Sequence, residues 1–437
     1  MDITQIIQEL AGTHRPLVRP QSGMYSEGFL RDMPKYFMEP DWLRAITPDE
    51  IEHYPEIENY NYSCYAKSAQ CTFVQMAAQV LMGFNHLALN VFDMYSSPFA
   101  DNEALISLME RRRSFLNALH SLIPEGRRPL GIETFVQPNN PLINRVSTPA
   151  GDSVDTWLDW KVIAGRLPCL GLPMTHSGHS PWLFLSGDDV LGLSDHDLDS
   201  LLRQGAVIDV KAAQALALRG QSTRIGVRVD EPIVLDDLGY EEFIDPQLSI
   251  RWHGRCFPLR PLVADGDWHR LIDLTGKGRM ASVIRNFRKE IIGPALLLTE
   301  NGNGERFAVL AFAGNGDRHL IENLMRGEQL RETFAWVARK PLPIVLTEEN
   351  PYLWPIINYT ADGRVVLGVI NLSSDTYDSV SVKTAPDSIS HNVHVLDETG
   401  CLTGVQFEND IITGNRVIRY RLTPLELAVF VFDDHGR

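Results

Sequence analysis

The stretch HYPEIENYNY, residues 53–62, places two carboxylates on either side of an isoleucine. Side chains alternate between the two faces of a β-strand, so Glu56 and Glu58 are predicted to point the same way from a strand over residues 50–58. Retaining cleavage of a glycoside uses two carboxylates about 5 Å apart, one as nucleophile and one as acid/base. Glu56 is therefore the candidate nucleophile and Glu58 its close rival. The same residues also fit an ordinary polar loop between a strand and a helix.

The residues that follow the two carboxylates are rich in tyrosine. Tyr60 and Tyr62 are predicted to bind a sugar, because their rings offer apolar faces and their hydroxyl groups form hydrogen bonds. Lys67 opens a helix predicted over residues 67–82. It is either a cation that faces the carboxylates or a surface residue at the helix N-terminus.

Residues 1–125 alternate between helical and strand-like segments. Apolar periodicity predicts helices over residues 3–11, 67–82 and 104–122, and a helical turn over residues 28–33 that stops at Pro34. Strands are predicted over residues 15–19, 50–58 and 87–92. These are three βα units, whereas a closed (β/α)8 barrel needs eight, so residues 1–125 are predicted to form a partial barrel.

The pattern changes twice after residue 125. Residues 126–345 are predicted to form an open α/β domain, with Ser194 capping a helix over residues 195–203. From residue 346 to residue 437 only short β-runs remain, separated by Gly, Asp, Asn and Ser, which predicts a C-terminal β-sandwich.

Composition excludes several classes of partner. The chain of 437 residues carries a formal net charge of −16, which disfavours a nucleic-acid or anionic-membrane surface. No apolar run is long enough to span a bilayer, and the first residues lack the pattern of a signal peptide, so we expect a cytoplasmic protein. The five scattered cysteines and the dispersed histidines form no metal-binding motif, and we expect neither a metal nor another cofactor.

The segment from Glu56 to Phe99 resembles barrel strands seven and eight of the clan A glycoside hydrolases, in particular the family 42 β-galactosidases. The likeness rests on the acidic strand end, the polar aromatic loop, a helix that ends in LMG (81–83) and the stretch FNHLALNVFD (84–93). The resemblance places the nucleophile at Glu56. It implies that Asn90 and Asp93 bind substrate after strand eight.

The same resemblance extends to both sides of this segment. Arg19 and Tyr25 would follow strand six and bind substrate. Downstream, SDHDLDSLLRQGAVIDVKAAQALALRGQSTRIGV (194–227) and GRVVLGVINLSSD (363–375) resemble the family's glutamine-amidotransferase-like domain and the start of its β domain. That middle domain drives trimerisation in the family, so we expect a homo-oligomer. A structural role is expected for it here, because the segment Ser186–Asp189 offers no nucleophilic cysteine.

One element of the family pattern has no counterpart in the sequence. The family's acid/base glutamate ends strand four, which would precede residue 1. We therefore expect β-galactosidase-like, retaining cleavage of a β-linked glycoside to need an upstream half-barrel, on a separate chain or in a longer parent protein. The alternative is a non-catalytic protein that binds carbohydrate or serves as an oligomerisation scaffold.

Overall fold

The computed structural model describes residues 3–59, 66–92, 98–124, 127–135, 159–259, 268–347, 349–385, 392–410 and 415–433. The chain divides into two compact units. Unit 1 contains residues 1–131, 168–178 and 343–437, and unit 2 contains residues 132–167 and 179–342. Within the described residues, no helix combines the length and apolar character that crossing a bilayer requires.

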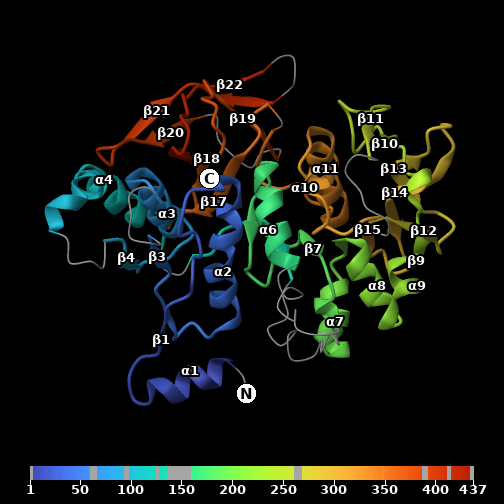
Figure 1. Cartoon of the computed structure of the whole chain (residues 1–437), viewed down its shortest axis with the longest axis horizontal. Helices are drawn as coiled ribbons and strands as arrows, with labels where there is room; N and C mark the ends of the chain where they lie inside the picture. Colours follow the sequence, from blue (N-terminus) through green and yellow to red (C-terminus); the bar gives the residue numbers. More distant parts are fainter. Residues whose placement is uncertain are drawn as a thin grey trace. The chain divides into compact units, whose positions relative to one another are not determined.

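The N-terminal part of unit 1 is a run of short parallel strands connected by helices (Figure 1). Strand β1 pairs in parallel with β2, and β3 pairs in parallel with β4. The elements are α1 (Ile3–Ala11), β1 (Leu17–Val18), α2 (Met33–Ile46), β2 (Glu52–His53), β3 (Glu56–Glu58), α3 (Ala69–Leu81), β4 (Ala88–Asn90) and α4 (Glu103–Leu122). The predicted helices over residues 3–11, 67–82 and 104–122 are confirmed within a few residues.

The expectation that Pro34 ends a helical turn was wrong. A 3-10 turn spans Leu30–Asp32, and α2 starts directly after it with Pro34 in its first turn. Proline is tolerated there because the first N–H groups of a helix have no partner within the helix. Helix α2 continues to Ile46 in spite of a second proline, Pro40, in its interior.

Two β-sheets in the C-terminal part of unit 1 enclose one apolar core. Their strand orders are β16-β19-β23-β22 and β17-β18-β24-β20-β21. The core contains Leu346, Val382 and Ile418 from the first sheet and Leu367 and Phe430 from the second. The strands are β16 (Ile344–Leu346), β17 (Leu353–Tyr359), β18 (Val365–Asn371), β19 (Val380–Thr384), β20 (Val393–Leu396), β21 (Leu402–Val405), β22 (Phe407–Asn409), β23 (Arg416–Ile418) and β24 (Leu427–Phe432).

Helix α3 packs against β17, β18 and β24 of the second sheet and so joins the two parts of unit 1. The Nδ2 of Asn358 donates to the carbonyl of Leu81 at 3.0 Å, and the Nε2 of Gln70 donates to the carbonyl of Leu425 at 2.8 Å. A Cβ on Gly368 would lie 1.9 Å from the side chain of Leu81, so the close approach of α3 to β18 requires glycine. The helix that follows the candidate carboxylates is thereby held by a large core.

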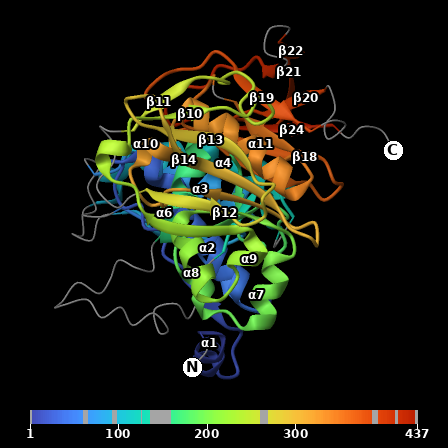
Figure 2. The same cartoon turned by 90° about the vertical axis from the view of Figure 1, so that its right-hand side faces the viewer.

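Unit 2 is built on a mixed sheet whose strands run in the order β11-β10-β13-β14-β15-β8-β7-β5. Figure 2 shows β10, β13 and β14 of this sheet side by side. Strands β5, β7, β8 and β15 are parallel, and the strands from β15 to β11 are antiparallel. The bounds are β5 (Ile132–Thr134), β7 (Leu183–Leu185), β8 (Ala206–Ile208), β10 (Tyr240–Phe243), β11 (Cys256–Pro258), β13 (Arg279–Arg285), β14 (Ile291–Glu300) and β15 (Arg306–Leu310).

Helices and a strand pair complete unit 2. Helix α11 contacts β8 and β15, and α8 contacts β15 and β9. Strand β9 (Val227–Pro232) pairs with β12 (His269–Asp273). The helices are α7 (Asp195–Leu202), α8 (Val210–Leu218), α9 (Ser222–Ile225), α10 (Arg318–Ile321) and α11 (Leu324–Ala338). Strand β6 (Met174–Thr175) belongs to unit 1, and α6 spans Asp159–Cys169.

Asp209 organises the carboxyl ends of the parallel strands in unit 2. It is fully buried after β8 and caps α8 by accepting from the backbone N–H of Ala212 at 2.8 Å. Ser186 Oγ, which follows β7, donates to it at 2.6 Å, and the N–H of Gly314 does so at 2.9 Å. Burial raises the pKa of Asp209. Ser186 is thus bound within a network that holds three loops together.

The predicted cap at Ser194 is present, and its removal should be measurable. Its hydroxyl accepts from the N–H of Asp197 at 3.1 Å at the start of α7. Ser194→Ala is expected to cost about 1 kcal/mol of unfolding free energy, because it leaves this N–H without its capping partner. Urea denaturation would measure the loss. Ser194→Asn should restore most of it, and equal losses in both variants would contradict the capping role.

Candidate functional site

The short parallel strands of unit 1 bring the predicted carboxylates together with two other predicted residues. The N–H of Glu56 donates to the carbonyl of Pro20 at 2.9 Å, which places β3 beside the segment that carries Arg19. Pairing of β3 with β4 puts Glu58 opposite Asn90. Arg19, Glu56, Glu58 and Asn90 therefore lie close together in this strand array.

Glu56 is the most enclosed of the predicted catalytic groups. Its exposed fraction is 5%, and it forms an ion pair with the guanidinium of Arg19. Burial raises the pKa of Glu56, and a side-chain hydrogen bond with Glu58 and the negative charge of Glu58 add to the rise. The positive charge of Arg19 opposes this rise. Arg19 is therefore the group that favours the ionised, nucleophilic form of Glu56.

Polar side chains from two neighbouring segments surround the pair. The Nδ2 of Asn90 donates to Oε1 of Glu58 at 3.4 Å. Tyr25 accepts a hydrogen bond from Gln21, and burial raises the pKa of its phenol, with further rises from the charges of Glu56 and Glu58. Tyr25 thus lies within electrostatic reach of both carboxylates.

Lys67 is buried, which rules out a surface position at the helix N-terminus. Its exposed fraction is 3%, and its Nζ donates to the carbonyl of Glu58 at 2.7 Å, to the carbonyl of Met24 at 3.2 Å and to Oε1 of Gln75 at 2.6 Å. An ammonium has three N–H donors, and all three serve protein acceptors. Lys67 therefore ties the end of β3 to the loop that carries Tyr25.

The titration of Lys67 should appear in the pH dependence of stability. Burial lowers the pKa of Lys67 to about 8, although the neighbouring Cys71, Glu58 and Glu27 favour its charged form. The unfolded chain therefore holds the proton up to its ordinary pKa of 10.5, whereas the folded chain has released it. Between about pH 8 and pH 10.5 the unfolding free energy contributed by Lys67 rises with pH, because folding releases the proton that the unfolded chain holds.

Comparison with a methionine variant isolates this effect. The unfolding free energy of the natural chain relative to Lys67→Met is expected to rise between about pH 8 and pH 10.5. Denaturant titrations across that range would measure it. Lys35→Met, at a partly exposed position, is the control and should show no such trend. A pH-independent difference for Lys67→Met would contradict the shifted titration.

The structure adds a residue that sequence reasoning missed, Asn59, and shows a partner of Glu27. Asn59 Nδ2 donates to the carbonyl of Val91 at 3.1 Å, and its Oδ1 accepts from Thr72 Oγ1 at 3.2 Å. Glu27 Oε2 accepts from Ser68, the N-cap residue of α3, at 2.7 Å from Oγ. Asn59 directly follows the carboxylates in the sequence. Its partners lie far along the chain, so no local sequence pattern predicts them. The predicted residues Tyr60, Tyr62 and Asp93 lie outside the described residues.

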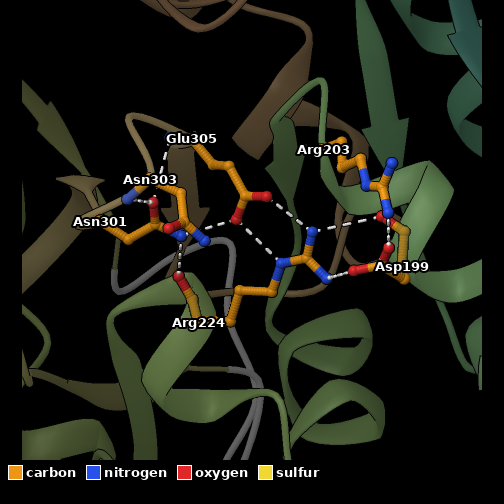
Figure 3. A network of polar contacts seen from close by, with 6 residues as sticks. All are labelled: Asp199, Arg203, Arg224, Asn301, Asn303 and Glu305. Carbon is orange, nitrogen blue, oxygen red and sulfur yellow. Dashed lines mark hydrogen bonds and ion pairs between the residues drawn. The ribbon is translucent and has the colours of Figure 1, made fainter.

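A hollow of about 590 Å³ in unit 2 is lined by a network of paired charges (Figure 3). Arg224 binds Glu305 through Nε at 2.8 Å and Nη2 at 2.6 Å, and binds Asp199 through Nη1 at 2.8 Å. Asn301 Nδ2 also donates to Glu305 at 2.7 Å, and Arg203 pairs with Asp199. Arg224 lowers the pKa of Glu305. Because these charges already have protein partners, the network fastens α7 and α9 to the loop at residues 301–305.

Among the residues that the structure describes, no group of three or more His, Cys, Asp or Glu side chains is arranged to hold a metal ion. The polar groups around Glu56 are carboxylate, guanidinium, phenol and amide groups. They are suited to acid–base and nucleophilic chemistry on a neutral polar substrate.

Solved structures named as glycosidases match the chain. An α-L-fucosidase isoenzyme 2 from Paenibacillus thiaminolyticus has a TM-score of 0.62 at 11% identity, over 99% of this chain and 67% of that chain. The GH42 β-galactosidase Gan42B matches with a TM-score of 0.57 at 10% identity, over 95% and 59%. A β-galactosidase from Rahnella sp. R3 matches with a TM-score of 0.57 at 9% identity, over 95% and 60%. The chain has a glycoside hydrolase-like fold.

These matches establish a similarity of fold, and they cover only part of the length of the matched proteins. The chain spans about 60% of the two β-galactosidases and 67% of the fucosidase. No protein-family model matches the sequence, and a search of curated protein sequences gave no match. At identities of 9% to 11%, activity and substrate are matters for proposal.

Proposed function

We propose that residues 15–92 contribute the nucleophile side of the active site of a retaining, β-galactosidase-like glycoside hydrolase. The observation that carries this proposal is the buried carboxylate of Glu56 in the short parallel strand β3, paired with Arg19 and beside Glu58 at the end of the same strand. Carboxyl ends of parallel barrel strands are where such enzymes place catalytic groups. Glu56 would attack the anomeric carbon and form a glycosyl ester as the leaving oxygen departs.

The neighbours of Glu56 have distinct proposed roles. Arg19 keeps the nucleophile ionised, and Tyr25 and Asn90 bind sugar hydroxyl groups beside it. Lys67 stabilises the site by donating a hydrogen bond to the carbonyl of Glu58. The side chains of Tyr60, Tyr62 and Asp93 are proposed to complete the sugar contacts from the segments that follow β3 and β4.

The acid/base carboxylate is proposed to come from polypeptide outside this sequence. A sugar must fit between nucleophile and acid/base, which needs a separation of about 5 Å. Glu58 shares a hydrogen bond with Glu56, which leaves no room for a sugar between them. Glu58 is therefore proposed to tune the pKa of Glu56 or to replace it as nucleophile. The missing half-barrel would be a separate chain or an upstream segment, and the assembly a homo-oligomer, a trimer by resemblance.

A substrate that needs no acid can test the nucleophile in this chain alone. In a 2,4-dinitrophenyl 2-deoxy-2-fluoro-β-galactoside, the phenolate departs with its bonding electrons without a proton, and the fluorine slows hydrolysis of the ester. Intact-mass analysis should show one added fluorosugar, and peptide mapping should place it on Glu56. A label on Glu58 would transfer the role to that residue. Galactose binding without labelling would favour the non-catalytic carbohydrate-binding alternative. The absence of both labelling and galactose binding would overturn the proposal.

A further inference from the structure

A hollow of about 380 Å³ in unit 1 lies at the amino-terminal ends of the same parallel strands. Arg15 precedes β1, His53 lies in β2, and Phe84 and His86 precede β4. Arg19 and Asn90 lie at the opposite ends of β1 and β4, and β3, which carries Glu56 and Glu58, contributes no residue to the lining. The hollow is therefore separate from the proposed sugar-cleaving site, and the proposed function leaves it without a role.

One wall of the hollow is formed by the guanidinium of Arg44. It donates to the carbonyls of Gly83 at 3.2 Å and Met82 at 2.9 Å, and it pairs with Asp41 at 2.7 Å. Its face lies on the ring of Phe84, with 4.1 Å between the guanidinium carbon and the ring centroid. The buried Nε of Arg44 has no hydrogen-bond partner among the described residues. Asp41 does not line the hollow, so the member of this ion pair that faces the hollow is the positively charged Arg44.

A second guanidinium is fixed beside the first. Arg128 donates to the carbonyls of Arg44 at 3.2 Å and Ser177 at 3.3 Å, and its nearest carboxylate in the lining, Asp49, is 3.9 Å away. The two guanidiniums also act on His53. Burial and the positive charges of Arg44 and Arg128 lower the pKa of His53 to about 4. Both guanidiniums are held before any ligand arrives, so an anion would bind without the cost of ordering them.

The entrance of the hollow carries a third cation and an aromatic ring. Arg15 is 68% exposed and pairs with Glu52 at 2.5 Å. The ring of His86 stacks on Tyr54 with 4.7 Å between centroids. Guanidinium groups recognise phosphate through paired N–H donors, and rings offer a flat surface to a sugar. The lining holds three arginines against two carboxylates, Asp49 and Glu52, so it carries a net positive charge in a chain of net charge −16.

We propose that this hollow binds a small phosphorylated sugar, with its phosphate against Arg44 and Arg128 and with Arg15 closing over the ligand. The volume is within the range of small-molecule sites, about 300 to 1,000 Å³, and exceeds what a bare ion would fill. The two fixed guanidiniums supply charge-assisted hydrogen bonds to phosphate oxygens. The site would let a phosphorylated metabolite bind at the end of the strand array opposite to the carboxylates.

Calorimetric titration of the full chain with glucose 6-phosphate, inorganic phosphate, galacturonate and glucose would test the proposal. Glucose 6-phosphate should bind at one site, inorganic phosphate more weakly, and glucose not at all. Arg15→Gln, at an exposed position, should weaken binding of the sugar phosphate about fivefold, and Arg128→Gln tenfold or more. Arg113→Gln, an exposed position on α4, changes the net charge equally and should leave the affinity unchanged.

Several results would overturn the proposal. Absence of glucose 6-phosphate binding would remove the site, and equal weakening by Arg113→Gln would show only general charge attraction. Inorganic phosphate binding as tightly as the sugar phosphate would reduce the hollow to an ion site. Galacturonate binding as tightly would reject phosphate as the recognised group. None of these measurements depends on glycosidase activity, so the hollow is tested separately from the proposed function.

Discussion

In the Glu56→Gln variant, transfer of the fluorinated sugar to the protein is expected to fall on the order of 10³-fold or more. The amide oxygen of glutamine is a poor nucleophile, and the glycosyl ester cannot form. The reaction of the natural chain should also slow as the pH falls through the pKa of Glu56. Burial and Glu58 raise that pKa above its ordinary value, so the loss begins at a higher pH than for an exposed glutamate. Time-resolved intact-mass spectra would measure both effects.

The matched control is Glu58→Gln at the neighbouring carboxylate of the same strand. This variant should still be labelled, and its labelling should extend to lower pH, because removing the Glu58 charge lowers the pKa of Glu56. Circular dichroism would show that both variants keep their fold. Equal labelling of Glu56→Gln and the natural chain would eliminate Glu56 as nucleophile.

The carboxylate pair was predictable because its signal is local. Alternation along β3 places Glu56 and Glu58 on one side, and helix periodicity with Ser68 and Ser194 as caps locates α3 and α7. The burial of Lys67 was not predictable in the same way. Its acceptors are 8 to 43 positions away in the chain, so only the folded arrangement reveals them.

Helix α2 and the antiparallel half of the unit 2 sheet show where local signals mislead. Pro34 and Pro40 are typical helix breakers, yet the first occupies the initial turn and the second is carried inside a helix that is buried along one side. Strands β10 and β13 contain Glu241 and Ser282, both completely buried. Polar residues in short strands weaken the apolar alternation that sequence analysis depends on, and the cation that pairs with Glu241, Arg326, is 85 positions away in the chain.

Glu241 and its partner give the largest stability effect that we expect in unit 2. The side chains of Glu241 on β10 and Arg326 on α11 are 0% and 1% exposed and form an ion pair. Arg326 also donates through Nε to the carbonyl of Leu320 at 3.2 Å and lies over the rings of Phe243 and Phe312. Arg326→Met is expected to cost about 3 to 5 kcal/mol of unfolding free energy, because it leaves a buried carboxylate without its cation.

A double variant distinguishes the loss of an unpaired charge from a simple loss of packing. Glu241→Leu combined with Arg326→Met removes both charges and should recover much of the stability lost in Arg326→Met, as replacements of buried ion pairs by apolar residues often do. The exposed pair between Arg203 and Asp199 is the control, and Arg203→Ala should cost less than about 1 kcal/mol. Denaturant titrations that follow unit 2 would compare the variants. If the double variant were as unstable as Arg326→Met, packing around Phe243 and Phe312, and not charge burial, would be what Arg326 supplies.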